Sequence, residues 1–285
     1  MSNIIEGMEL NQSPYGILGK ASKVIDLADS NGHWVSGFTH KVVDANINVT
    51  NFPGRVGDPN ANFDTVIKSV KVGSPTLEYT PFFIDSRTFG TTMGADIDVY
   101  KQNAKDTLIL ATQKSVEQEL WTGVISSLVN AEYTNPAEFI HNRSFVDQEY
   151  ITMLTTVAVS PKQGLSLLEE ALGERTLGYE GVIHAPRRLA SLARVREYLK
   201  DGVLRTNLHT PVVAGTGYNK INGKYYMVAT GPLTVVLGDI EIIPTTPQQA
   251  VNVRNNTVEY IASRPAGVFW NTEGLFAVEI DPTLD

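Results

Sequence analysis

The sequence contains no cysteine, and its acidic residues outnumber its basic ones. Without cysteine, neither a disulfide bond nor a thiolate-bound metal can brace the fold. The chain has 23 Lys and Arg against 31 Asp and Glu, which leaves a net charge of −8. This balance disfavours the wrapping of nucleic acid, because phosphates attract a basic surface. It suits a protein that lies beside DNA without adhering to it.

Long apolar runs are also missing. No stretch approaches the roughly 20 apolar residues that cross a bilayer, and the N-terminus lacks a basic segment followed by an apolar run. We therefore expect a cytosolic chain with no membrane partner. With 42% hydrophobic and 19% charged residues over 285 positions, the composition predicts one large folded domain or two modest ones.

Turn-forming residues are concentrated in residues 51–64, NFPGRVGDPNANFD, where nine of fourteen are Asn, Asp, Gly or Pro. Strand-like runs flank this stretch on both sides: HWVSGFTHKVV and NINVTNF before it, TVIKSVKV and PTLEYTPFFID after it. The pattern predicts a long hairpin over residues 33–85. Because a two-stranded ribbon cannot bury both of its faces, something outside the hairpin must cover it.

The clearest helix pattern lies between Ala95 and Thr122, a stretch without Gly or Pro. Apolar residues recur there at spacings of three and four, and a helix of this length spans on the order of 40 Å. Asp96 and Asp98 stand at its entrance, where carboxylates favour the positive end of the helix dipole, and we prefer this role to Mg²⁺ binding. A weaker pattern in residues 19–29 hints at a short helix.

Residues 150–245 predict a mixed α+β unit. A helix begins at Ser160-Pro161 and is expected to stop at Gly173, and a second runs from Pro186 to Gly202. Strand patterns are GVIHA before the second helix and HTPVVAG, KYYMVAT, PLTVVLG and DIEIIP after it. The last forty residues return to strands, and we expect RPAGVFWNTEGLFAVEID to form a hairpin that turns at residues 271–274.

The common catalytic motifs do not occur in working form. The stretch around Ser166 resembles a nucleophile elbow but lacks the last glycine and lies inside a predicted helix. Gly215 and Gly217 follow a strand without a helix behind them to receive a phosphate, so we interpret them as a loop. The five histidines lack the i, i+4 spacing of metal ligands. We predict no catalytic, cofactor-binding or metal site.

Basic residues cluster in one predicted helix of the second region, with acidic residues nearby in sequence. The basic residues are Arg187, Arg188, Arg194, Arg196 and Lys200, and the acidic ones are Glu169, Glu170 and Glu174. One interpretation is a solvated face laced by salt bridges. The other is a charged contact with another copy of the chain, since opposite charges fix the register of partners. The sequence leaves both open.

The order of these parts resembles the major capsid proteins of tailed double-stranded DNA bacteriophages, which have the Hong Kong 97 fold. Four stretches are also similar to capsid proteins of actinobacterial phages: YTPFFIDSRTFGTT, SVEQELWTG, GYEGVIHAPRRLASL and RPAGVFWNTEGLFAVEID. The resemblance implies an α+β fold divided along the chain. Its parts would be an N-terminal arm at 1–32, an extended loop at 33–90, a peripheral domain with a long spine helix at 91–149, an axial domain at 150–245, and returning peripheral strands at 246–285.

The resemblance implies a structural protein and not an enzyme. Its members self-assemble into hexamers and pentamers of an icosahedral head that encloses double-stranded DNA without reading its sequence. The chain would be made in the host bacterial cytoplasm and end in the virion, with a portal and, as separate chains, scaffolding or decoration proteins as partners. The candidate inter-subunit contacts are Phe52, Arg55, Asp58, Lys68, Lys71, Glu169, Glu170, Arg187, Arg188 and Arg194.

Some members of this family join subunits by a lysine–asparagine isopeptide bond that a glutamate assists. The corresponding residue types are Lys41, Lys68, Lys71, Asn255, Asn256, Asn271 and Glu273, but none matches the family's crosslinking residues one by one. Two alternatives to the phage head stay open at this point. One is the shell of an encapsulin-like compartment, and the other is a soluble α+β hydrolase that uses Ser166 or an Asp pair.

Overall fold

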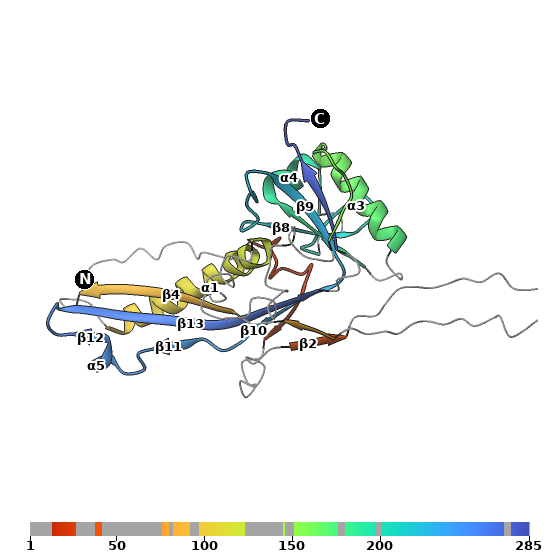
Figure 1. The fold of residues 1–285 in the computed structure, drawn as a ribbon. Coiled ribbons are helices and arrows are strands. Elements are labelled where there is room, and N and C mark those ends of the chain that lie inside the picture. The colour runs from red at the N-terminus through yellow and green to blue at the C-terminus, as the bar shows by residue number, and fades with distance from the viewer. Residues whose placement is uncertain are drawn as a thin grey trace, which may run out of the picture.

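The computed structural model of the chain describes residues 13–26, 38–41, 76–79, 82–91, 97–122, 145, 151–175, 180–197, 201–270 and 275–284. These residues form two six-stranded sheets and a separate two-stranded pair (Figure 1). Strands β1, β10, β13 and β11 follow one another in the first sheet, and β4 and β12 also pair with β13. The order in the second sheet is β5-β14-β9-β6-β8-β7.

Strand β13 (Thr257–Trp270) is the central strand of the first sheet. It pairs antiparallel with β4 (Phe82–Thr91), β10 (Leu233–Leu237), β11 (Glu241–Ile243) and β12 (Val251–Asn252). The side chains of β4 alternate strictly at its start, with Phe82, Ile84 and Ser86 buried and the residues between them exposed. One face of this sheet therefore belongs to the core.

Helix α1 (Ile97–Thr122) packs along the buried face of β4 and β13. It confirms the predicted helix and has Asp98 in its first turn. Ala104, Leu108 and Val116 are fully buried on the side that meets the sheet. The helix has 26 residues, so it spans about 39 Å and runs the length of β13 (Figure 1).

The predicted short helix at residues 19–29 is wrong. Lys23–Asp26 forms β1, which pairs in parallel with β10 from Lys23↔Thr234 to Asp26↔Leu237. A single short helix is costly to nucleate, whereas the edge of β10 offers unpaired backbone groups along its whole length. The sheet edge therefore overrides the weak local pattern.

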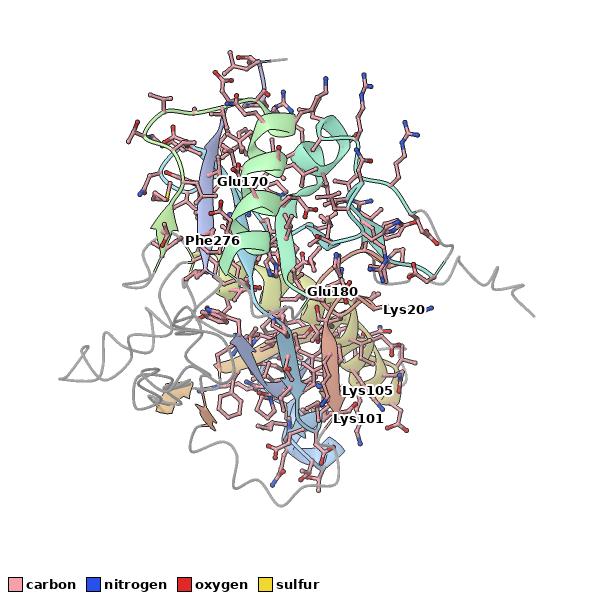
Figure 2. All side chains as sticks on the ribbon, turned by 90° about the vertical axis from the view of Figure 1, so that its right-hand side faces the viewer. Lys20, Lys101, Lys105, Glu170, Glu180 and Phe276 are labelled. Atoms are coloured by element: carbon pink, nitrogen blue, oxygen red, sulfur yellow. The ribbon has the colours of Figure 1, made fainter. Side chains whose placement is uncertain are left out.

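The second sheet consists of β5 (Thr152–Met153), β6 (Val182–Pro186), β7 (Leu204–Arg205), β8 (Pro211–Gly215), β9 (Tyr225–Thr230) and β14 (Phe276–Ile280). Helices α3 (Pro161–Arg175) and α4 (Arg187–Leu192) pack against it. Seen from the side, Glu170 and Phe276 lie in this part of the molecule, and Lys101 and Lys105 lie in the other (Figure 2). A short helix, α5 (Pro247–Ala250), precedes β12.

Both predicted helix ends in this unit are wrong. Helix α3 continues through Gly173 to Arg175, because Gly173 does not take the positive φ with which a glycine ends a helix. Helix α4 ends at Leu192 instead of Gly202. Arg194 takes a left-handed φ of 61° directly after α4, and Arg196 then forms a bridge with Arg205.

The predicted C-terminal hairpin is also wrong. Strand β13 lies in the first sheet, whereas β14 pairs with β9 and β5 in the second. The residues of β14 from Phe276 to Val278 are all buried, as expected for a strand with covered faces. Strands β10 and β11 lie within residues 150–245, the range expected to form one α+β unit. Both belong to the first sheet, whereas the other strands of that range belong to the second.

Strands β2 (Phe38–Lys41) and β3 (Thr76–Tyr79) pair antiparallel, from Phe38↔Tyr79 to Lys41↔Thr76. This pairing confirms the base of the predicted hairpin. The rest of the hairpin lies outside the described residues, and so do the candidate contacts Phe52, Arg55, Asp58, Lys68 and Lys71.

Candidate assembly surfaces

The face of the first sheet opposite α1 exposes large apolar side chains. Phe83 and Phe89 on β4 are 51% and 62% exposed, and Ile243 on β11 is 52% exposed. The register places Ile243 opposite Ile261, which in turn lies opposite Arg87, so all three share this face. Apolar side chains gathered on one open face are typical of an interaction surface.

A charged group stands within this apolar face. The Arg87 side chain pairs with Glu259 at 2.8 Å, and its guanidinium lies over the Phe89 ring at 5.4 Å from the centroid. The two charged side chains are 58% and 41% exposed, and exposed pairs of this kind contribute little to folding. Their effect is to hold Arg87 flat on the surface, where a partner could contact it.

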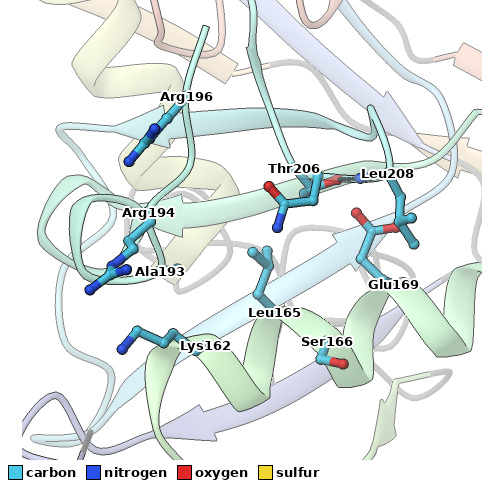
Figure 3. Close-up of a pocket in the computed structure, with 10 residues that line it drawn as sticks. Lys162, Leu165, Ser166, Glu169, Ala193, Arg194, Arg196, Thr206 and Leu208 are labelled. Atoms are coloured by element: carbon cyan, nitrogen blue, oxygen red, sulfur yellow. Dashed lines mark hydrogen bonds between the residues drawn. The ribbon is translucent and has the colours of Figure 1, made fainter. Parts of the chain in front are cut away.

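A pocket of about 600 Å³ opens beside α3 (Figure 3). Helix α3, the segment after α4 and the loop between β7 and β8 supply its walls. The lining residues are Lys162, Leu165, Ser166, Glu169, Ala193, Arg194, Arg196, Thr206, Asn207 and Leu208. Lys162, Arg194 and Arg196 gather at one end, and Glu169 lies at the other with Thr206 and Leu208 (Figure 3).

The end of α4 determines where Arg194 points. The Arg194 N–H donates to the Ser191 carbonyl, and the Val195 N–H donates to the Ala190 carbonyl. These two bonds form a Schellman motif, in which the residue with positive φ is usually glycine. An arginine here costs on the order of 1 kcal/mol in backbone strain.

The structure contains no ion pair between the predicted basic and acidic clusters among the described residues. Arg187, Arg188, Arg194 and Arg196 are exposed, and Arg188 lies 6.0 Å from the centroid of the Tyr225 ring. The Glu169 carboxylate accepts a hydrogen bond from the Thr210 hydroxyl at 2.8 Å. A face laced by internal salt bridges is therefore not what these residues form. Lys200 lies outside the described residues.

A buried carboxylate joins the N-terminal segment, α1 and the loop after β8. Glu117 on α1 is fully buried, and it accepts hydrogen bonds from the backbone N–H groups of Ile17 at 3.0 Å and Gly217 at 2.7 Å. The Thr216 hydroxyl donates a third at 3.1 Å. Burial raises the pKa of Glu117 against the opposing effect of these three bonds. Thr216 and Gly217 form the expected loop, which packs on α1, whereas Gly215 is the last residue of β8.

A second buried polar group lies nearby. The His184 ring contacts the Tyr218 hydroxyl through Nδ1 at 2.9 Å and the Thr230 hydroxyl through Nε2 at 3.0 Å. The Thr230 hydroxyl donates its proton to the Gly231 carbonyl, so it must accept from Nε2–H, and the Tyr218 hydroxyl must donate to Nδ1. Burial lowers the pKa of His184 to about 3, so the ring is neutral.

Glu117 and His184 each connect separate segments of the fold. Ser166 lies exposed on α3, where a nucleophile elbow cannot form. Within the described residues, no three His, Cys, Asp or Glu side chains could hold a metal ion together. No described helix is long and apolar enough to cross a membrane. Asn255 and Asn256 lie between β12 and β13, while Asn271 and Glu273 lie outside the described part.

Sequence reasoning missed Glu117 and Lys162. The only available signal for Glu117 was its place in the i, i+4 row Gln113, Glu117, Trp121, because a tryptophan is rarely left on a solvated face. Lys162 had no signal, since it lies 32 residues before Arg194 along the chain (194 − 162) and only the fold brings the two into one pocket.

No protein-family model matches the chain, and no curated protein matches it either. The capsid of an empty GTA particle is similar in structure at 11% identity, with a TM-score of 0.57 over 98% of this chain and 94% of that one. Mycobacterium phage Cain gives 12% identity and a TM-score of 0.55 over 98% and 96% of the two chains. Phage G major capsid and decoration proteins give 12% and 0.54 over 98% and 95%.

The chain has the Hong Kong 97-like capsid fold. This finding confirms the α+β class and the predicted resemblance to the Hong Kong 97-like capsid fold. At identities of 11% to 12%, the similarity shows the fold alone. Contacts between subunits have to be inferred from the residues of this chain.

Proposed function

We propose that the chain is the major capsid protein of a tailed double-stranded DNA bacteriophage and that its function is self-assembly. The observation that carries the proposal is the capsid fold, which extends over 98% of the chain and 94% of the GTA capsid chain. Because the similarity extends over nearly the whole of both chains, almost no residues remain for a further domain with another function.

The paired strands β2 and β3 support this function. They form a sheet of their own, separate from the two large sheets, so the described part of the hairpin borrows no neighbouring strand. Two strands alone are marginally stable in water. We propose that an adjacent copy covers the hairpin, and that the exposed face around Phe83, Phe89 and Ile243 is one of the surfaces available for such a contact.

The assembly would consist of hexamers and pentamers in an icosahedral shell around double-stranded DNA. The net charge of −8 fits an inner shell surface that does not adhere to packaged DNA. The protein would be made in the host cytoplasm and end in the virion, with a portal and separate scaffolding or decoration proteins as partners. The role is structural, and Phe52, Arg55, Asp58, Lys68, Lys71, Glu169, Glu170, Arg187, Arg188 and Arg194 are proposed inter-subunit contacts.

The test exploits the register of the hairpin. Lys41 and Thr76 lie directly opposite each other, so residues 42–75 can be replaced by an Asn-Gly turn without moving either strand. We expect the full chain to form closed particles under the electron microscope. The shortened chain should keep its melting transition and circular dichroism and sediment as a small species.

Two outcomes would contradict the proposal. The first is a full chain that stays monomeric under all assembly conditions, and the second is a shortened chain that still forms closed shells. Purified particles that contain a cellular protein in place of DNA would support the encapsulin-like alternative. Ligand-dependent melting of a monodisperse small species would support an enzyme.

A further inference from the structure

Two carboxylates of the second unit have no partner among the described residues. This unit comprises residues 151–230 and 275–284, and most of its described acidic side chains are engaged. Glu169 accepts from Thr210, Glu197 from Tyr15, Glu180 and Asp201 pair with Arg205, Glu279 pairs with Lys224, and Asp281 accepts from Thr283. Glu170 and Glu174 remain, both exposed on α3, and Figure 2 shows the position of Glu170 on this helix.

These two glutamates stand four residues apart on one helix face, which we call the acidic stripe. Like charges at i, i+4 repel each other and destabilise a helix by a few tenths of a kcal/mol unless a cation lies between them. None of the described basic side chains forms an ion pair with either residue. The stripe therefore lacks the cation that its own geometry favours.

The pocket beside α3 has the opposite imbalance. Lys162, Arg194 and Arg196 lie together at one end of it (Figure 3), and none of them has an ion-pair partner among the described residues. Its one carboxylate, Glu169, lies toward the other end and is bonded to Thr210. This end of the pocket is therefore a concave, positively charged surface.

The pocket and the stripe lie on different sides of the same helix. Each residue of an α-helix advances by about 100°, so Glu170 and Glu174 point about a third of a turn away from the row formed by Lys162, Leu165 and Glu169. The third side of α3 carries Leu168 and Leu172, which are buried against the sheet. One copy cannot bring its own stripe into its own pocket.

The backbone at Arg194 indicates that its side chain is needed. Glycine would satisfy the Schellman motif after α4 without strain, yet the chain carries arginine at a φ of 61°. Non-glycine residues in such conformations concentrate at functional sites. The residue that bears this strain lines the pocket beside Lys162 (Figure 3).

We infer that the pocket receives the acidic stripe of an adjacent copy, so that Lys162, Arg194 and Arg196 of one subunit bind Glu170 and Glu174 of the next. The contact joins two different surfaces, and such a head-to-tail contact closes into a ring when it repeats around an axis. The inference rests on the proposed capsid function, because it assigns this contact to the ring of subunits within a capsomer.

A charge swap tests the contact. The pocket variant carries Lys162→Glu, Arg194→Glu and Arg196→Glu, and the stripe variant carries Glu170→Lys and Glu174→Lys. Each should lower the yield of closed particles at least tenfold, because like charges then meet. The chain with all five substitutions should recover particles to within about threefold of the unchanged protein. Lys101→Glu with Lys105→Glu on α1 is the control and should leave the yield unchanged.

Two substitutions at Arg194 separate the contact from folding. Arg194→Gly removes both the strain and the charge, so the melting temperature should stay the same or rise while particle yield falls. Arg194→Lys keeps the charge and should retain most of the assembly. Melting is measured in the shortened, unassembled chain described above.

The outcomes distinguish this inference from the proposed function. If the unchanged protein forms particles and the pocket and stripe variants do so equally well, the contact is wrong and the capsid function stands. The pairing is also wrong if the chain with all five substitutions fails to recover particles while the pocket variant and the stripe variant are both folded. If the unchanged protein forms no particles under any condition, the capsid function fails and the contact fails with it.

Discussion

The Glu117 carboxylate accepts a hydrogen bond of 2.7 Å from the backbone N–H of Gly217, which lies 100 residues further along the chain. The same carboxylate also binds the Ile17 N–H and the Thr216 hydroxyl. One side chain thus fastens the N-terminal segment and the second sheet to α1. It acts there beside the Trp121 ring, which stacks on Tyr218 with 4.5 Å between the ring centroids.

We expect Glu117→Ala to lower the free energy of unfolding by at least about 2 kcal/mol. The substitution leaves the buried N–H donors of Ile17 and Gly217 without an acceptor, and each buried unsatisfied group costs about 1–3 kcal/mol. Glu117→Gln should cost less, because one amide oxygen remains to accept. Urea unfolding of the unassembled chain measures both, and exposed Lys105→Ala on α1 should change stability by less than about 0.5 kcal/mol. An unchanged midpoint for Glu117→Ala would contradict this role.

His184 should make the fold less stable as the pH falls. Its pKa is about 3 in the folded chain and near 6.5 in the unfolded one, so the unfolded chain binds more protons between these values. Stability is therefore fully present above about pH 6.5 and is lost progressively toward pH 3, by up to about 5 kcal/mol.

Unfolding measured from pH 7 to pH 4 checks this slope, and His184→Gln should flatten it. The raised pKa of Glu117 acts in the opposite direction, because the folded chain then takes up a proton more readily than the unfolded one as the pH falls. A wild-type slope that survives in His184→Gln would assign the acid sensitivity to other groups.

Two glycine substitutions should have opposite signs. A Cβ on Gly217 would lie 2.6 Å from both the Lys114 carbonyl oxygen and the Glu117 Cβ, so Gly217→Ala must push the loop away from α1. We expect a loss of about 1–3 kcal/mol. A Cβ on Gly173 meets nothing within 4 Å, and this residue lies inside α3. Gly173→Ala should therefore stabilise the chain by about 0.5–1 kcal/mol.

The open face of the first sheet should matter for assembly more than for folding. Phe83→Ser and Phe89→Ser remove half-exposed rings, so the melting temperature of the unassembled chain should change little, while particle yield should fall several-fold. Val99→Ser on α1 is the matched control, because Val99 is as exposed as Phe83, at 51%, on the other side of the sheet. Equal yields for all three variants would exclude this face as a contact.

Elements with a strong local pattern were predictable from the sequence. Helix α1 follows from apolar residues at spacings of three and four without Gly or Pro, and β6, β8, β9 and β10 follow from short apolar runs between turns. The base of the hairpin at Phe38–Lys41 and Thr76–Tyr79 follows from the turn-forming residues between two strand-like runs. In each case, residues close in sequence carry the signal.

The tertiary structure alone decided how distant segments meet. Nothing local distinguishes β14 as a partner of β9 from a partner of β13, because apolar strands pair with whichever edge the packing presents. The acceptor for Gly217 comes from α1, and the pocket around Arg194 collects residues from three separate segments. Periodicity and turn chemistry act over a few residues and determined the elements, whereas sheet order and side-chain partners depend on long-range contacts that only the folded chain makes.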